Sequence, residues 1–283
     1  MATYQTSKLV DGFVFLEGPR WHQGKLWVSD MWDYTVYTVT ASGARERVCK
    51  VDERPSGLGF AKDGSLLIVS MANRSLLRYA NGKLERLADL SPWATGDCND
   101  MVTDAQGRCY VGNFGYDLLA GAAPATAKLV CVEPDGRARS VADGLNFPNG
   151  AVIMNGGRTL VVAETFGHCL TAFDVAADGS LSNRRCFAAL GEHTPDGICL
   201  DKDGGIWVAS FMTDVFLRVK DGGAVTDTVP VGGRRAVACQ LGGDDGRTLF
   251  CLTYDGTIDD LHHHKPGAVI ETVRVEHAAA GSP

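Results

Sequence analysis

Residues 194–210, TPDGICLDKDGGIWVAS, hold the unit that decides the fold. A short apolar segment ends at Leu200, the turn Lys202-Asp203-Gly204 follows, and a second apolar run, GIWVAS, occupies 205–210. Glycine in such a turn suits the left-handed backbone of a tight hairpin. The stretch therefore predicts two adjacent antiparallel strands.

The second strand of this hairpin recurs along the chain. The six runs are KLWVSD at 25–30, SLLIVS at 65–70, RCYVGN at 108–113, TLVVAE at 159–164, GIWVAS at 205–210 and TLFCLT at 248–253. Their central residues are spaced by 41, 42, 51, 46 and 43 residues. A period of this length is typical of a propeller blade of four strands. The longest step is explained by an insertion in the third blade at 117–127, where helical periodicity is absent.

Both ends of the chain contribute to the predicted ring. Residues 4–12 and 268–276 (AVIETVRVE) are strand-like segments that remain after six repeats have been counted from about residue 13. Pairing them in one blade would remove the open sheet edge. No linker composition interrupts the chain, so we expect residues 1–283 to form a single all-β domain, a six-bladed β-propeller closed by its N- and C-terminal strands.

Charge and segment composition argue against several classes of partner. The formal charge is −7, and the basic residues form no block, which argues against nucleic acid as a partner. Neither a basic, apolar leader nor a run of about 18 apolar residues is found, so we expect no membrane partner and a cytoplasmic location. We expect a monomer or a weak homo-oligomer.

One position in each repeat carries the chemistry. It lies eleven to thirteen residues before each strand centre and is occupied by Glu17, Ser56, Asn99, Asn149, Asp196 and Ala238. A propeller brings equivalent positions together around its axis.

Glu17, Asn149 and Asp196 would then supply two carboxylates and an amide oxygen to one point on this axis. This donor set suits calcium, magnesium or manganese, and the lack of His and Cys at these positions argues against a dedicated zinc site. We expect calcium, with magnesium, manganese or zinc as alternatives. Asn149 and Asp196 each precede a glycine and are also good turn residues, but their common repeat position favours the metal site.

The chain resembles the senescence marker protein (regucalcin)/gluconolactonase family of metal-dependent six-bladed propeller lactonases. The matching motifs are FLEGPRWHQGKLWVSD at 15–30, NDMVTDAQGRCYVGN at 99–113, FPNGAVIMNGGRTLVVAET at 147–165 and TPDGICLDKDGGIWVAS at 194–210. The resemblance implies that Glu17, Asn149 and Asp196 bind the metal and that Asp196 is the catalytic acid and base. It also implies that Asn99 lies beside the metal, as a ligand or a substrate contact.

One position departs from the pattern of this family. Its sugar-lactone members have an arginine two residues before the asparagine that matches Asn99, whereas this chain has Asp97. Asp97 is therefore a predicted substrate contact with reversed charge. The change makes a less hydroxylated lactone an alternative to a sugar lactone.

Residues just after the repeated strands should line the same mouth of the channel. The predicted substrate contacts there are Trp32, Asn113, Phe114, Tyr116 and His168. An aromatic, concave site suits a small and partly apolar ligand, although packing between blades is the alternative role for each aromatic residue. His168 would either assist proton transfer or form a structural hydrogen bond.

The family resemblance, together with these residues, implies a hydrolase that opens a small lactone. The metal would polarise the carbonyl for attack by water, and Asp196 would accept a proton and return it to the leaving oxygen. Two alternatives stay open: hydrolysis of aryl or phosphate esters on the same metal site, and a calcium-binding scaffold propeller without catalysis.

Overall fold

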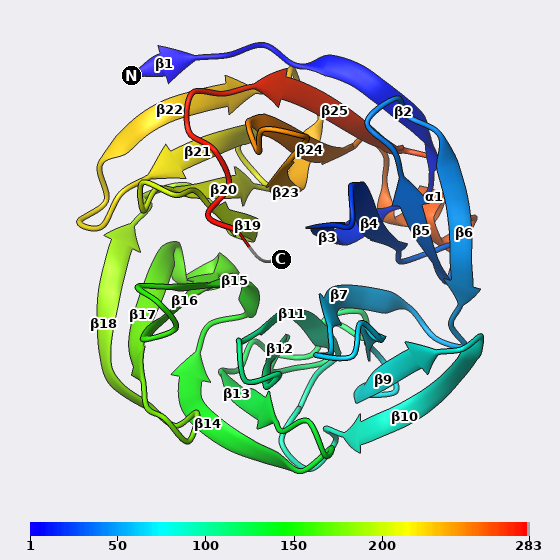
Figure 1. Ribbon diagram of the computed structural model, residues 1–283, viewed down its shortest axis with the longest axis vertical. Coiled ribbons are helices and arrows are strands. Elements are labelled where there is room, and N and C mark those ends of the chain that lie inside the picture. The colour runs from blue at the N-terminus through cyan, green and yellow to red at the C-terminus, as the bar shows by residue number, and fades with distance from the viewer. Residues whose placement is uncertain (282–283) are drawn as a thin grey trace.

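The computed structural model describes residues 1–281 and contains six β-sheets arranged around one axis (Figure 1). Blade 1 consists of β3 (Leu16–His22), β4 (Lys25–Asp30), β5 (Thr35–Val39) and β6 (Arg45–Lys50). Blade 2 consists of β7 (Pro55–Phe60), β8 (Leu66–Ser70), β9 (Ser75–Ala80) and β10 (Lys83–Asp89). Blade 3 consists of β11 (Cys98–Thr103), β12 (Cys109–Asn113), β13 (Ala127–Val132) and β14 (Ala138–Leu145). Blades 4 and 5 are formed by β15 (Pro148–Met154), β16 (Thr159–Glu164), β17 (Cys169–Val175) and β18 (Leu181–Ala189); and β19 (Pro195–Leu200), β20 (Ile206–Ser210), β21 (Val215–Val219) and β22 (Val225–Pro230). The predicted six-bladed propeller is confirmed.

Blade 6 joins the two ends of the chain. Its inner strands are β23 (Arg235–Gly242) and β24 (Thr248–Tyr254), and β25 (Ala268–Arg274) pairs antiparallel with β2 (Ser7–Phe13). The N-terminal strand therefore closes the ring, as predicted. One further pairing was not anticipated: β1 (Ala2–Thr3) adds a parallel edge strand to β22 of blade 5.

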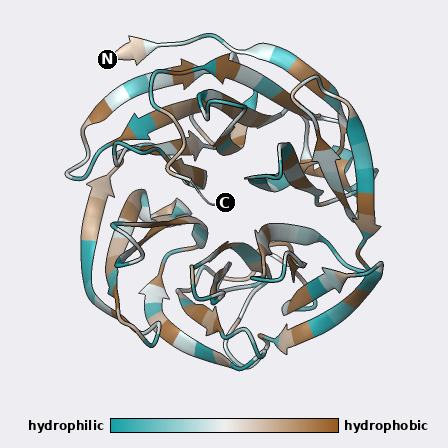
Figure 2. Ribbon diagram, in the orientation of Figure 1, coloured by the Kyte–Doolittle hydropathy of each residue, from teal (hydrophilic) through white to brown (hydrophobic). Residues whose placement is uncertain are grey.

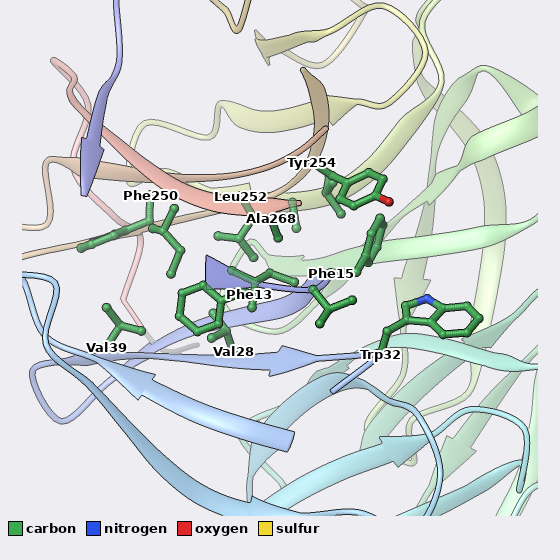
Figure 3. Packing of buried hydrophobic residues seen from close by; sticks show 14 of the residues in the cluster. Phe13, Phe15, Val28, Trp32, Val39, Phe250, Leu252, Tyr254 and Ala268 are labelled. Atoms are coloured by element: carbon green, nitrogen blue, oxygen red, sulfur yellow. The ribbon is translucent and has the colours of Figure 1, made fainter. Parts of the chain in front are cut away.

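Contacts between neighbouring blades form the hydrophobic core. Between blades 6 and 1, Phe13, Val28, Phe250, Leu252 and Ala268 point toward one another, and each is at most 2% exposed (Figure 3). Second strands such as β8, β12 and β16 are buried along their whole length, because blades cover both of their faces. This explains why these strands are continuous apolar runs in the sequence. The outer strands instead show hydrophilic and hydrophobic bands (Figure 2).

The innermost strand of every blade has an irregular register at its first residues. The shifts fall between Glu17 and Arg20, Pro55 and Leu58, Cys98 and Met101, Pro148 and Ala151, Pro195 and Ile198, and Ala236 and Ala238. Each shift begins at, next to or close before the repeat position that carries the predicted metal ligands. Bulges of this kind redirect side chains, and here they interrupt the regular hydrogen bonding between strands at the positions of the predicted metal ligands.

Glycine after Asn149 lets blades 4 and 5 approach each other closely. A Cβ atom at Gly150 would lie 2.6 Å from the backbone nitrogen of Ile198 and 2.7 Å from the carbonyl oxygen of Asp196. Any side chain there would push the two innermost strands apart. The Pro-Asn-Gly sequence thus brings the strand of Asn149 against the strand of Asp196.

The chain turns inward after β25. Ala279 forms an isolated bridge with Asp201, and the backbone nitrogen of Lys202 donates to the carbonyl of Ala278. This segment runs from blade 6 toward the middle of the ring (Figure 1). The helical elements are the 3₁₀ turn η1 (Thr165–Gly167) and α1 (Ile258–His262), and neither these nor any other helix within residues 1–281 has the length and apolarity of a membrane span.

Candidate metal centre

Asn149 of β15 and Asp196 of β19 meet at the inner end of blades 4 and 5. The amide nitrogen of Asn149 lies 2.5 Å from Oδ1 of Asp196, and the two residues are only 5% and 7% exposed. The same nitrogen donates to Oγ1 of Thr165 at 3.2 Å, and this hydroxyl donates to the carbonyl of Pro195 at 2.7 Å. Thr165 therefore orients the Asn149 amide.

This orientation leaves one oxygen without a partner. Oδ1 of Asn149 is buried and accepts no hydrogen bond from residues 1–281. An unpaired buried acceptor costs about 1–3 kcal/mol, and a bound cation would remove this cost. Glu17, which lies on β3 and is 5% exposed, supplies the remaining carboxylate of the predicted set.

Two carboxylates and an amide oxygen fit one divalent ion with a preference for oxygen ligands. No group of three or more His, Cys, Asp or Glu side chains that could hold a metal occurs in the described part of the chain. An ion held by Glu17 and Asp196 would therefore need the amide oxygen of Asn149 as its third protein donor.

Burial makes this centre unfavourable for negative charge in the absence of a cation. Burial is the main reason why the pKa of the Glu17 carboxyl lies well above its usual range, and the negative charges of Asp196 and Asp100 raise this pKa further. Burial likewise raises the pKa of Asp196, against the lowering effect of its hydrogen bond from Asn149. Acidic groups with strongly raised pKa values are typical of functional sites.

A buried ion pair lies further along the same strands. Arg20 of β3 donates from Nη2 to Oδ1 of Asp100 on β11 at 2.7 Å, and also to the carbonyl of Met101. Arg20 lines a cavity of about 980 Å³ that is bordered by the far ends of β11, β15 and β19 and by the turns that follow them. Since the predicted ligands stand at the beginnings of these strands, the cavity lies at the opposite end of the channel.

The predicted residue Asn99 is the second residue of β11, and Asp97 directly precedes this strand. Asn99 is 3% exposed and donates to the carbonyl of Pro148 at 3.4 Å, beside the strand of Asn149. Asp97 accepts a hydrogen bond of 2.7 Å from Nη2 of Arg54. Burial raises the pKa of the Asp97 carboxyl, and Arg54 partly offsets this effect.

Arg54 was missed at the level of sequence. It precedes Ser56 by two residues, as Asp97 precedes Asn99, so its repeat position was the available signal. Its guanidinium lies 5.3 Å from the ring centroid of Trp32. The predicted substrate contact Trp32 is only 7% exposed, and one face of its ring packs against the Arg54 guanidinium.

The aromatic residues of blades 3 and 4 pack around Phe147, which sequence analysis also missed. Its ring stacks on Phe114 with centroids 4.2 Å apart, and Tyr116 and Phe166 lie 6.2 and 4.9 Å away. Phe147 adopts a left-handed backbone (φ 60°) two residues before Asn149. Phe166 is 49% exposed, so this cluster has an open apolar edge.

Asn113 and His168, two further predicted substrate contacts, are engaged with backbone groups. Asn113 donates to the carbonyl of Lys128 at 2.8 Å and accepts from the nitrogen of Gly115 at 3.0 Å. His168 is exposed, and its Nδ1 lies 3.0 Å from the carbonyl of His193. These contacts help to hold the segments that follow β12 and β16, and a role of Asn113 and His168 toward a substrate stays a prediction.

Comparison with known proteins relates this geometry to a family. A regucalcin of Danio rerio is 26% identical over 206 residues, and a 6-deoxy-6-sulfogluconolactonase of Pseudomonas putida is 29% identical over 199 residues. These alignments cover 71% and 68% of this chain and 66% of each relative, so the chain spans slightly less than two thirds of their length.

A solved structure and a family model extend the match. The structure of a calcium-binding protein, regucalcin, from Agrobacterium tumefaciens superposes with a TM-score of 0.83 over 100% of this chain and 98% of that protein, which at 19% identity supports the fold alone. The family model "SMP-30/Gluconolactonase/LRE-like region" matches residues 15–255. The chain therefore belongs to the SMP-30/gluconolactonase/LRE-like family that its sequence motifs predicted.

Proposed function

We propose that this protein is a lactonase that binds one divalent metal ion, calcium first among the candidates, through Glu17, Asn149 and Asp196. The observation that carries the proposal is the buried Asn149 amide, whose nitrogen is bound to Asp196 and Thr165 and whose oxygen has no partner in the described residues. The relative named as a 6-deoxy-6-sulfogluconolactonase supports lactone hydrolysis as the reaction class.

The residues take distinct roles in this proposal. When bound, the ion would supply Lewis-acid polarisation of the ester carbonyl and acidify water. Asp196 would accept the proton of the attacking water as the new C–O bond forms. It would then return this proton to the ring oxygen as the original C–O bond breaks, which yields a hydroxy acid.

A titration assay tests this function directly, because each turnover releases a carboxylic acid. Purified protein is freed of metal with a chelator, loaded with calcium, magnesium, manganese or zinc, and assayed at constant pH with γ- and δ-lactones and with aryl and phosphate esters. We expect turnover of lactones only with metal. Full activity of the chelated protein would overturn the metal-dependent mechanism.

A second candidate function is calcium binding without catalysis. It is favoured by the similarity to proteins named regucalcin and to a structure described as a calcium-binding protein. Calorimetry separates the two candidates. Tight calcium binding together with no turnover of any ester in the panel would support the second.

A further inference from the structure

The residues two positions before the repeat position form a second set of equivalent positions in the six blades, called the second layer below. They are Phe15, Arg54, Asp97, Phe147, Thr194 and Ala236. Only Arg54 and Asp97 in this layer are charged, and they come from the neighbouring blades 2 and 3. The polar pair therefore lies on blades 2 and 3, and Phe147 with its aromatic neighbours lies beside it on blades 3 and 4.

The Arg54 side chain is held from three directions. Nη2 donates to Asp97 at 2.7 Å, Nε donates to Glu53 at 3.3 Å, and the guanidinium faces the Trp32 ring at 5.3 Å. The side chain is 10% exposed, and its Nη1 group makes no hydrogen bond to residues 1–281. A guanidinium fixed in this way presents a preoriented donor at little further cost in side-chain entropy.

The local charge determines which ligand groups this polar pair can accept. Arg54 contributes one positive charge, whereas Glu53 and Asp97 contribute two negative charges, so this region is net negative. An anionic group would gain little from Arg54 and would be repelled by the carboxylates. A hydroxyl group can accept from Nη1 of Arg54 and donate to Asp97.

We propose that Arg54 and Asp97 are specificity-determining residues that bind the hydroxyl groups of an uncharged lactone and disfavour lactones with an anionic substituent. The inference rests on the proposed lactonase function. Asp97 alone favoured a less hydroxylated substrate, because it stands where an arginine was expected. Arg54 removes this reason, since it supplies a guanidinium beside Asp97 from the adjacent blade.

Three substrates and two variants test the inference. Values of kcat/KM are measured for glucono-δ-lactone, for its 6-phosphate and for δ-valerolactone, which lacks hydroxyl groups. Arg54→Met should lower the value for glucono-δ-lactone by about 10- to 100-fold, the range for losing a charged hydrogen bond, and that for δ-valerolactone by less than about 3-fold. Asp97→Asn should raise the 6-phosphate relative to glucono-δ-lactone by about 5-fold or more.

Matched controls separate specificity from folding. Arg137→Met removes an arginine that pairs with Asp135 on an exposed outer hairpin, and it should leave all three values unchanged. Each variant should keep the calcium Kd of the parent, and Tm is measured to show how much stability the loss of the Arg54–Asp97 ion pair costs. If Arg54→Met does not fold, Arg54→Lys keeps the charge but loses the planar fork, and it should still lower the preference for glucono-δ-lactone.

Two results would overturn the inference and leave the lactonase proposal intact. One is an equal loss of kcat/KM on glucono-δ-lactone and δ-valerolactone in Arg54→Met. The other is a parent enzyme whose kcat/KM is higher for δ-valerolactone or for the 6-phosphate than for glucono-δ-lactone. Absence of turnover on any lactone with metal bound would instead overturn the proposed function. In that event glucose, an uncharged ring of the same size, serves as the probe in calorimetry. Arg54→Met must then weaken glucose binding by about 10-fold, and an unchanged Kd would refute the role of Arg54.

Discussion

Replacing Asp196 with asparagine should make the metal-free protein more stable and the metal-loaded protein inactive. The side chain is buried without a cation beside it, and burial raises the pKa of its carboxyl. The unfolded chain ionises this group freely at pH 7, so folding includes the cost of burying a charge or taking up a proton. Asparagine has nearly the same volume and can still accept the hydrogen bond from Asn149.

The expected gain is about 1–3 kcal/mol for the metal-free protein at pH 7, the usual scale for relieving an unfavourable buried polar group. In a chain of this size, each kcal/mol raises Tm by about 2–4 °C. The gain should disappear as the pH falls through about 4, where the unfolded state also protonates this aspartate. Lactone turnover should fall by more than about 100-fold, because an amide cannot accept the proton.

Asp201, at the end of the same region of blade 5, provides a matched control with the opposite sign. It is 1% exposed and accepts hydrogen bonds from Nε of Arg218 at 2.6 Å and from the nitrogen of Gly205 at 2.9 Å. Asp201→Asn removes the closer of the two carboxylates that pair with buried Arg218, the other being Asp227 at 3.6 Å, and should cost about 3–5 kcal/mol. Both variants are unfolded thermally in EDTA and in calcium. The reasoning fails if Asp196→Asn lowers Tm in EDTA as Asp201→Asn does, or if its turnover stays within a few-fold of the parent.

Three further predictions concern the metal. Chelation should abolish turnover while leaving the β-sheet circular dichroism intact, and calcium at about 100 times its Kd should then raise Tm by about 5–10 °C; a chelated protein that unfolds would contradict this. Metal affinity should increase from pH 5 to pH 8, because protons on the carboxyls of Glu17 and Asp196, whose pKa values are raised, compete with the ion. Calorimetry in two buffers of different ionisation enthalpy should detect the released protons. A pH-independent Kd would oppose the assignment. Thr165→Val, which cannot orient the Asn149 amide, should weaken metal binding by about 10- to 100-fold, and an unchanged Kd would show that Thr165 has no positioning role.

Much of the fold could be read from the sequence because its signals are local and repeated. Each tight turn and each apolar second strand depends on a few adjacent residues, and their spacing alone predicts six blades. Ring closure could also be predicted, since residues 4–12 and 268–276 were the strand-like segments left without a partner. The parallel pairing of β1 with β22 involves two residues and left no comparable pattern.

Within the candidate site, the sequence predicted only the residues that occupy equivalent positions in the repeats. Equivalence between blades placed Asn149 and Asp196 in one layer, and their side chains meet at 2.5 Å. The same argument was weaker for residues in the loops after the strands. Asn113 and His168 follow the repeated strands as expected, yet their polar atoms bind backbone groups of strand β13 and of the loop before β19.

The sequence by itself determined the number of blades, the closing strands and the ring of oxygen-bearing residues, because each follows from periodicity along the chain. Only the tertiary structure decided that Thr165 orients Asn149 and that Arg54 is the partner of Asp97. These contacts depend on how side chains turn at irregular strand starts and on the close approach of blades permitted at Gly150. A hydrogen bond between residues 16 or 43 positions apart is set by this three-dimensional geometry, which the repeat pattern does not encode.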